Sequence, residues 1–395
     1  MADADTTTTG EAGTTPPDAG RGAPARRPKR WPVVLAVVGA VLVAVWFGLG
    51  FWNVNYYAIT PGNATPVAPL ITVPANLDRP LTGSILLTDV YVTPLTAQSY
   101  LVQRFISSDS QVLPSGAVLD PLTPADQFTD QGYLDMNQAQ SYATAAALTH
   151  LGYSVSAHNA GTLVYGTVAG SPAAASLRVG QVITAVNGKA TLTQCALVNS
   201  LHGVAPGTPV TLRVEQSTIS PSGTVAPGPI VSKQVIPTKP PRGLVETGCS
   251  AKPTAPTAYL GLSSQTQQAW TFPVKVTVHT ADIGGPSAGL SMTLGIIDKL
   301  SGGDLTGKRI VAATGTIDPA GDVGDVGGVA QKTIAVERAG ATVFFVPPQE
   351  LAAARSTATP QLHVYAVSSL TQALRILQRL GGTMTTRHVS AQAAP

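Results

Sequence analysis

Two residues in the second half of this 395-residue sequence could together carry out nucleophilic chemistry. Ser287 follows a Gly-Gly-Pro run and precedes apolar residues at helical spacing, so the serine is predicted to begin a helix. The first N–H groups of a helix lack intrahelical partners and could therefore stabilise an oxyanion. Lys332 begins a second predicted helix after Gly327 and Gly328, among apolar neighbours. Burial lowers the pKa of a lysine, and a neutral amine can then accept the proton of a serine.

The glycines before this serine would complete such a site. Gly284 and Gly285 have no side chain, so a substrate backbone could approach them closely. The backbone amides near Gly285 and Ser287 are the predicted donors to an oxyanion. The resulting hypothesis is acyl transfer by a serine with a lysine as its general base.

A Ser-His-Asp triad is the alternative arrangement for Ser287. His279 would be its base, with Asp318 or Asp322 behind the imidazole. A histidine within a predicted strand is more often structural, however, and the sequence around Ser287 does not resemble the usual nucleophile elbow. The lysine is therefore the preferred base.

Two other motifs resemble binding sites but lack residues that such sites need. The run 302–309 resembles a phosphate-binding loop, but Arg309 stands where the motif needs the Ser or Thr that holds magnesium. The run also follows a predicted helix and precedes a predicted strand, which is the reverse of the order that the motif needs. Asp318, Asp322 and Asp325 do not have the spacing of a calcium loop. We therefore expect no cofactor and no metal.

Periodicity predicts the elements that position these residues. An apolar run indicates a strand at 84–92, and apolar residues on one face indicate a helix at 135–151 that ends at Gly152. Around the candidate site the same criteria predict a strand at 274–279 and helices at 287–300 and 332–339.

Residues 155–238 carry a separate pattern. Ser171 and Pro172 can begin a short helix, and Asn187-Gly188 is a strong hairpin signal. The run SPAAASLRVGQVITAVNG resembles the core of PDZ domains of the bacterial protease type. Gln181 departs from the aspartate usual there. The resemblance implies a module that binds peptides by adding a strand to a sheet edge. A generic small β-rich domain is the alternative.

The candidate site itself resembles the proteolytic domain of Lon-type proteases over residues 258–380. GGPSAG looks like the family's nucleophile motif, and ATGTIDPAGDVGDVGGVAQK looks like its strand, hairpin and lysine segment. The resemblance implies that Ser287 is the nucleophile, that Lys332 is the base and that Thr314 orients the lysine. Many relatives carry an acidic residue where Gly284 stands, so Asp282 is the candidate replacement. The family commonly forms hexameric rings, which implies a possible hexamer.

A membrane segment is predicted at 31–52, where 22 residues contain no charge and have tryptophans at both ends. Basic residues precede this segment, at positions 21, 26, 27, 29 and 30, whereas the first one after it is Arg79. The positive-inside rule then places the N-terminus in the cytoplasm and the remainder outside. A cleaved signal peptide is the alternative, but the apolar run is long and no clear cleavage site follows it.

Composition limits the remaining function classes. The net charge is +3, charged residues make up 11% and no basic patch carries interleaved aromatics, so nucleic-acid binding is not expected. Cys195 and Cys249 belong to no CxxC pair, which argues against zinc. A disulfide between them and two buried free thiols are equally open.

The predicted chain is α+β. It has a cytoplasmic disordered tail (1–30), a transmembrane helix (31–52), a region that packs with the protease (53–152), a PDZ-like domain (153–238), a Lon-like domain (258–380) and a disordered tail (381–395). The predicted function is an ATP-independent, membrane-tethered serine endopeptidase that cleaves exported or membrane-associated polypeptides. The alternative is a non-catalytic, membrane-anchored PDZ adaptor that binds peptides.

Overall fold

The computed structural model describes residues 30–119, 124–220, 223–244, 249 and 257–384. The chain divides after Leu49 into two units. Helix α1 (Trp31–Leu49) belongs to the first unit, and none of its residues is buried. It is three residues shorter than the predicted membrane segment, because the chain turns at Gly50 and Phe51 before β1 begins. By length and composition α1 is the one helix among the described residues that could cross a membrane.

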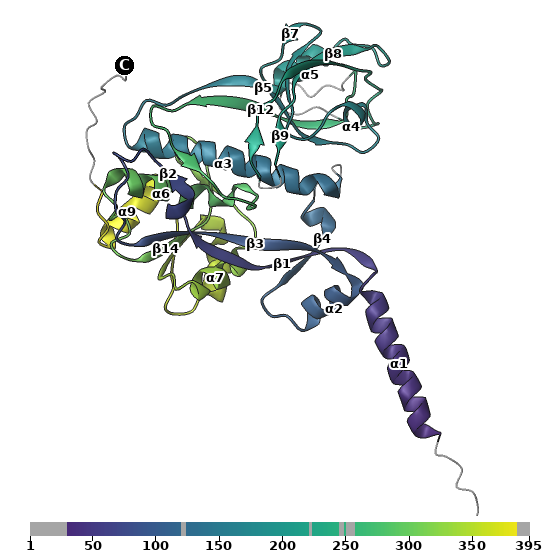
Figure 1. Ribbon diagram of the computed structural model, residues 1–395, viewed down its shortest axis with the longest axis vertical. Coiled ribbons are helices and arrows are strands. Elements are labelled where there is room, and N and C mark those ends of the chain that lie inside the picture. The colour runs from purple at the N-terminus through teal and green to yellow at the C-terminus, as the bar shows by residue number, and fades with distance from the viewer. Residues whose placement is uncertain (1–29, 120–123, 221–222, 245–248, 250–256, 385–395) are drawn as a thin grey trace, which may run out of the picture. The chain divides into compact units, whose positions relative to one another are not determined.

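A six-stranded mixed sheet forms the centre of the second unit (Figure 1). Its order is β18 (His363–Ala366), β17 (Val343–Val346), β14 (Ile310–Ala313), β3 (Ser84–Thr96), β1 (Asn53–Pro66) and β4 (Gln111–Pro114). The first four strands run parallel, while β1 is antiparallel to both of its neighbours. The predicted N-terminal region therefore supplies half of this sheet.

Helices cover both faces of this sheet. Leu87, Val311 and Phe345 face a core that includes residues of α3 (Phe128–His150), α6 (Gly289–Ser301) and α9 (Leu370–Arg379). Leu86 and Phe344 face the opposite core, with α7 (Val329–Arg338) and α8 (Leu351–Thr357). Because adjacent strand residues point to opposite faces, the near-continuous apolar strands bury both of their sides.

A second sheet is inserted in sequence between α3 and α6. Its order is β11 (Ile230–Val235), β8 (Val210–Glu215), β6 (Val182–Val186), β5 (Ser156–Thr167) and β12 (Leu262–Thr271), and β7 (Lys189–Ala190) pairs with β6. Helices α4 (Pro172–Ser176) and α5 (Gln194–Leu201) belong to the same module, which has its own core. A short hairpin of β9 (Thr218–Ile219) and β10 (Val225–Ala226) extends from it.

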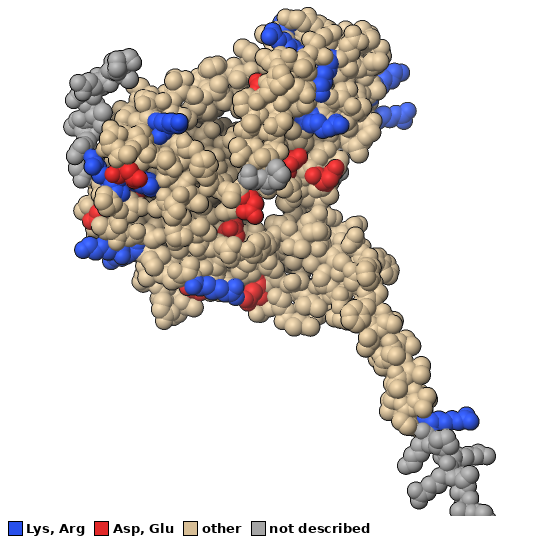
Figure 2. Space-filling view, in the orientation of Figure 1, with Lys and Arg blue, Asp and Glu red and all other residues tan. Residues whose placement is uncertain are grey.

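Local sequence signals account for this module. The Ser171 hydroxyl accepts the N–H of Ala174 and caps α4, as predicted. Asn187 and Gly188 both have positive φ and form the β6–β7 hairpin. Charged side chains are few and scattered on the face shown in Figure 2, in keeping with the low charge of the chain.

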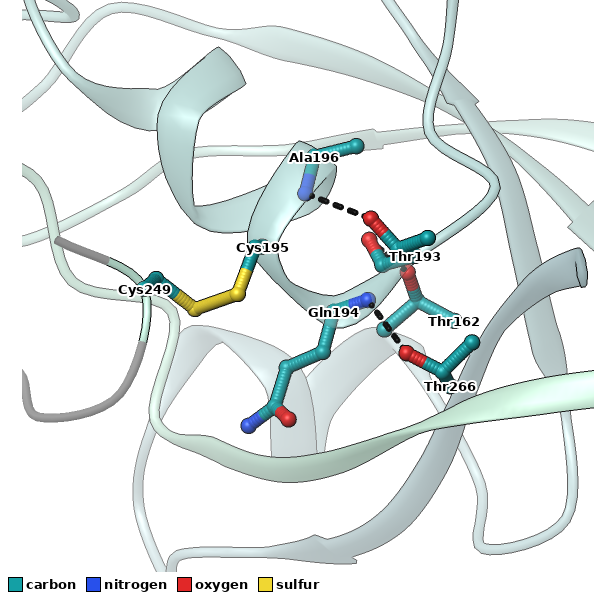
Figure 3. The surroundings of a disulfide bond; sticks show 7 residues. All are labelled: Thr162, Thr193, Gln194, Cys195, Ala196, Cys249 and Thr266. Atoms are coloured by element: carbon teal, nitrogen blue, oxygen red, sulfur yellow. Dashed lines mark hydrogen bonds between the residues drawn. A yellow bond between two sulfur atoms is a disulfide. The ribbon is translucent and has the colours of Figure 1, made fainter.

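A disulfide joins Cys195 of α5 to Cys249 (Figure 3). The sequence left open whether these two cysteines are bonded or are free thiols, and in the structure they are bonded. The N-terminus of α5 is also fixed to the edge strand β12, because the N–H of Gln194 donates to Thr266 Oγ1 at 3.1 Å. Thr193 caps the same helix through the N–H of Ala196.

Several predicted boundaries differ from the structure. The strand expected at 274–279 is reduced to β13 (Thr277–Val278), which pairs with β2 (Ile71–Thr72). Pro273 has no N–H to donate to a strand partner, and the chain bends there. Helix α3 begins seven residues before the predicted start, at Phe128. Of the predicted tails, residues 1–29 and 385–395 lie outside the described residues.

Candidate active site

Ser287 lies in η4 (Pro286–Ala288), a single 3₁₀ turn that leads directly into α6. The serine is half-buried, and Gly285 before it has φ of +88° with open space around its Cα. This backbone conformation favours glycine, and a side chain at the same point would occupy the space in front of the turn. The predicted start of the helix at Ser287 is therefore correct to within a turn.

The glycines of this turn contact α3 closely. The N–H of Gly285 donates to the carbonyl of Gly132 at 2.7 Å. A Cβ on Gly284 would lie 3.2 Å from the backbone of Gly132. Because its N–H is already engaged, Gly285 cannot donate to an oxyanion in this arrangement, which corrects the role predicted for it. Ser287 lies in the first turn after Pro286, where backbone N–H groups have no intrahelical partner, so its N–H is a candidate donor to an oxyanion.

The end of β14 holds the backbone of the serine from the other side. The N–H of Gly315 donates to the carbonyl of Ser287 at 2.9 Å. The hydroxyl of Thr314 donates to the same carbonyl at 3.2 Å. The carbonyl of Gly315 in turn accepts the N–H of Leu290 at 3.1 Å. The serine backbone is thus fixed to the carboxyl end of a central strand.

Lys332 approaches Thr314 from α7, which covers the opposite face of the central sheet from α6. It lies in the second turn of α7, and only 2% of the residue is exposed. Its Nζ donates to Thr314 Oγ1 at 3.1 Å. Thr314 therefore bridges the lysine amine and the serine backbone, and the structure brings these three predicted residues together.

Burial changes the acid–base behaviour of this amine. Desolvation lowers the pKa of Lys332 to about 8, although the negative charges of Asp89 and Glu350 favour the protonated form and oppose the shift. An amine with a pKa near 8 is partly neutral at physiological pH, so Lys332 can accept a proton there.

Sequence reasoning missed Asp89, which lies on β3. Its half-buried carboxylate accepts the N–H of Asn63 at 2.8 Å. A Cβ on Gly62 would overlap with the carboxylate, so the turn of β1 fits closely around it. Burial raises the pKa of Asp89, and the charge of Lys332 opposes that shift. The available signal was a single charged residue within an otherwise uncharged strand.

Asp282 occupies a different place from the one predicted. It is exposed, and its charge raises the pKa of Asp89. The carboxylates whose charges raise the pKa of Lys332, against the larger effect of burial, are Asp89 and Glu350.

The components of the alternative triad lie apart from this arrangement. His279 is exposed, and its N–H donates to the carbonyl of Leu70. Asp318 accepts the N–H of Asp322 in the turn between β15 (Thr316–Ile317) and β16 (Val323–Gly324). Within the described part of the chain, no hydrogen bond joins His279 to Ser287.

Two cavities lie along α3, and one of them adjoins the candidate site. One of about 400 Å³ is lined by Pro286 of the serine turn, by the β15–β16 hairpin and by α3. The other, of about 300 Å³, lies between α3 and the inserted module, along strand β12. Gln138 and Tyr142 of α3 line both cavities. Among the described residues, no group of three or more His, Cys, Asp or Glu side chains could hold a metal ion.

Comparison with known families identifies the part of the chain that carries this geometry. Residues 260–378 match the model of the Lon protease (S16) C-terminal proteolytic domain. These residues form a Lon-type serine peptidase domain. The match begins at residue 260, yet the sheet of the Lon-type domain also contains β1, β3 and β4 from residues 53–114.

One curated relative agrees with this assignment over part of the chain. The Lon protease of Chloroflexus aggregans is 34% identical over 94 residues, which is 23% of this chain and 11% of that protein. The chain thus matches only a small part of that curated relative. The PDZ domain of an SdrC-like protein from Listeria monocytogenes covers 27% of this chain and 90% of its own length, at 16% identity and a TM-score of 0.21.

Proposed function

We propose that this chain is a membrane-anchored serine endopeptidase with Ser287 as nucleophile and Lys332 as general base. The observation that carries the proposal is the buried amine of Lys332, which Thr314 connects to the backbone of Ser287. A buried lysine is rare in proteins unless it has a partner or a function, because burial disfavours its charge. In a Lon-type domain, the role proposed for this buried lysine is that of the general base.

The hydrogen bonds support a role for each residue in this reaction. A neutral amine has one lone pair, and donation from Nζ to Thr314 Oγ1 fixes one of its N–H bonds, so the lone pair can face Ser287. Lys332 takes the proton of Ser287 Oγ as the oxygen attacks the peptide carbonyl. The protonated amine then donates that proton to the leaving amine. In the second half, Lys332 accepts a proton from the water that attacks the acyl-enzyme, and it returns this proton to Ser287 Oγ as the acyl–oxygen bond breaks.

Cleavage assays with single variants test this assignment. We expect the wild-type chain to cleave an unfolded exported protein, and Ser287→Ala and Lys332→Ala each to lower kcat/KM by at least about 10³-fold. Lys299→Ala is the matched control, because Lys299 pairs with Asp78 on the surface. Equal cleavage by all variants would exclude the dyad. Binding without cleavage by the wild-type chain would instead favour the peptide-binding adaptor.

The two cavities suggest how a polypeptide binds. In this proposal, residues next to the scissile bond occupy the cavity beside Pro286, and more distant residues reach the cavity under the inserted module. The module would bind exported or membrane-associated polypeptides. Cleavage is proposed to be independent of ATP, because residues 302–309 form a turn between α6 and β14 and not a phosphate-binding loop. Equal rates with and without ATP would support this part.

The proposed location is the outer face of a cytoplasmic membrane, with α1 as the anchor. The basic residues before α1 support a cytoplasmic N-terminus. The Cys195–Cys249 disulfide supports an oxidising compartment for the remainder of the chain. Protease added outside intact spheroplasts should degrade the C-terminal part, and protection of that part would reverse the proposed orientation. Assembly into a hexamer, implied by the family resemblance, is part of the proposal and can be measured by native mass spectrometry in detergent.

A further inference from the structure

Exposed apolar side chains are concentrated in one part of the second unit. We define the β1–α2 arm as residues 51–66 and 90–119, which comprise all of β1, the second half of β3, α2 (Ala97–Phe105) and β4. Most of the large apolar side chains exposed outside α1 belong to this arm: Phe51, Trp52, Tyr56, Tyr91, Leu101, Phe105 and Ile106. Apolar surface gathered in this way indicates an interaction site.

The same arm is nearly free of charge. Arg104 and Asp109 are its only charged residues. Asp109 pairs with Arg338 of α7 at 2.7 Å, and the guanidinium of Arg104 lies 5.7 Å from the ring centre of Phe105. Figure 2 shows no charged side chain over α2 and β4 on the visible face.

Helix α2 presents its apolar residues from a fixed position. Thr96 and Ser99 form a capping box at its start. Tyr100 packs on Tyr56 of β1, with ring centres 4.9 Å apart. Leu101 and Phe105, one helical turn apart, are exposed, and Phe105 and Ile106 are 75% and 76% exposed. The helix is therefore amphipathic, with an unpartnered apolar face.

Chain connectivity limits how far α2 can lie from the anchor. The N–H of Ala97, the first residue of α2, donates to the carbonyl of Trp52 at 2.7 Å. Trp52 is the third residue after the end of α1. Three residues span at most about 10 Å and the hydrogen bond adds about 3 Å, so α2 begins within about 13 Å of the end of α1 along the chain.

We propose that α2 lies on the outer membrane surface, with Leu101, Phe105 and Ile106 inserted at the boundary between headgroups and acyl chains. This inference rests on the proposed role of α1 as a membrane anchor. Arg104 lies between Leu101 and Phe105 in the sequence and meets the lipid phosphates, as basic residues of interfacial helices do. A second attachment beside the anchor limits tilting and holds the Lon-type domain at a constant height above the bilayer.

Site-directed spin labelling tests this position in the full chain. A nitroxide is attached to Phe105→Cys in proteoliposomes of phosphatidylethanolamine and phosphatidylglycerol, and Ile230→Cys on β11 is the control. Both positions are exposed, so the substitutions leave the fold intact. Compared with the label at 230, the label at 105 should collide several-fold less often with a water-soluble nickel reagent and several-fold more often with oxygen.

The possible outcomes separate this inference from the proposals on which it depends. If the protein floats with the liposomes but both labels meet nickel equally, α2 docking is overturned while the anchor stands. If the protein does not float, the anchor and the docking both fail. Dipolar broadening of the spectrum of the label at 105 that disappears on dilution with unlabelled protein would show that the apolar face of α2 contacts a second copy of the chain instead of the membrane. Cleavage assays are independent of all three results.

Discussion

At the scale of single residues, the buried lysine dominates both chemistry and stability. Its side chain gains one hydrogen bond, from Nζ to Thr314, in place of full hydration. Burial lowers the pKa of Lys332 from 10.5 to about 8, so the folded state binds its proton less tightly than the unfolded chain does. The penalty is fully present below pH 8 and disappears as the pH rises towards the pKa of the unfolded chain.

Lys332→Met should therefore stabilise the protein while abolishing cleavage. We expect a gain on the order of 3 kcal/mol at pH 7, since each pKa unit corresponds to about 1.4 kcal/mol. The gain should decline between pH 8 and pH 10.5, where the wild-type lysine loses its penalty. Pulse proteolysis in urea at pH 7 and pH 10 measures both values. Equal stability of variant and wild type at pH 7 would show that the amine is not desolvated.

Asp89→Asn should change the pH dependence of cleavage. As a base, Lys332 is active when neutral, so kcat/KM should rise with pH, with a midpoint near 8. The charge of Asp89 raises the pKa of Lys332, and its removal should move the rising limb to lower pH. Asparagine keeps an acceptor for the N–H of Asn63. The control Asp78→Asn, on the surface, should leave the midpoint unchanged, and an unshifted Asp89→Asn profile would exclude the coupling.

At the scale of elements, structure that depends on neighbouring residues could be predicted from the sequence, whereas contacts between distant segments could not. The cap at Ser171 and the hairpin at Asn187-Gly188 depend on neighbouring residues and were predicted closely. The bridge through Thr314 was expected only from family resemblance. Asp89 could not be predicted, because it approaches Lys332 only once β3 pairs with β14. The contact of Gly285 with Gly132 likewise depends on the packing of α3.

Close packing of α6 makes Gly289 a sensitive position. A Cβ there would lie 2.8 Å from the backbone nitrogen of Ile317 in β15. Because backbone atoms cannot move aside easily, Gly289→Ala should destabilise the Lon-type domain by about 1–3 kcal/mol. Gly327→Ala is the matched control, since no atom lies within 4 Å of its added Cβ. Urea denaturation compares the two variants, and similar stabilities would mean that α6 can shift to accommodate the methyl group.

At the scale of the whole molecule, the inserted module interrupts the Lon-type domain in sequence but not in space. Strands β1 and β3 and helix α3 precede the module, whereas α6, β14 and α7 follow it. All six contribute to the cores on the two faces of one sheet, and α3 and α6 share one of them. The peptidase fold therefore closes only when residues from both sides of the insertion come together.

Replacing residues 157–270 by a short turn tests this organisation. The Lon-type core should remain folded, because its hydrophobic contacts come from outside that segment. Cleavage of a short fluorogenic peptide should persist, while cleavage of a long unfolded polypeptide should fall several-fold. Circular dichroism and the two assays measure these outcomes. Loss of the fold would show that the module is part of the peptidase core.

Ser156 and Thr271 form the last pair of the β5–β12 ladder, so the chain enters and leaves the module at neighbouring points. An ancestor could have acquired or exchanged the whole module at this junction, with a hairpin turn in its place, and kept its reaction centre undisturbed.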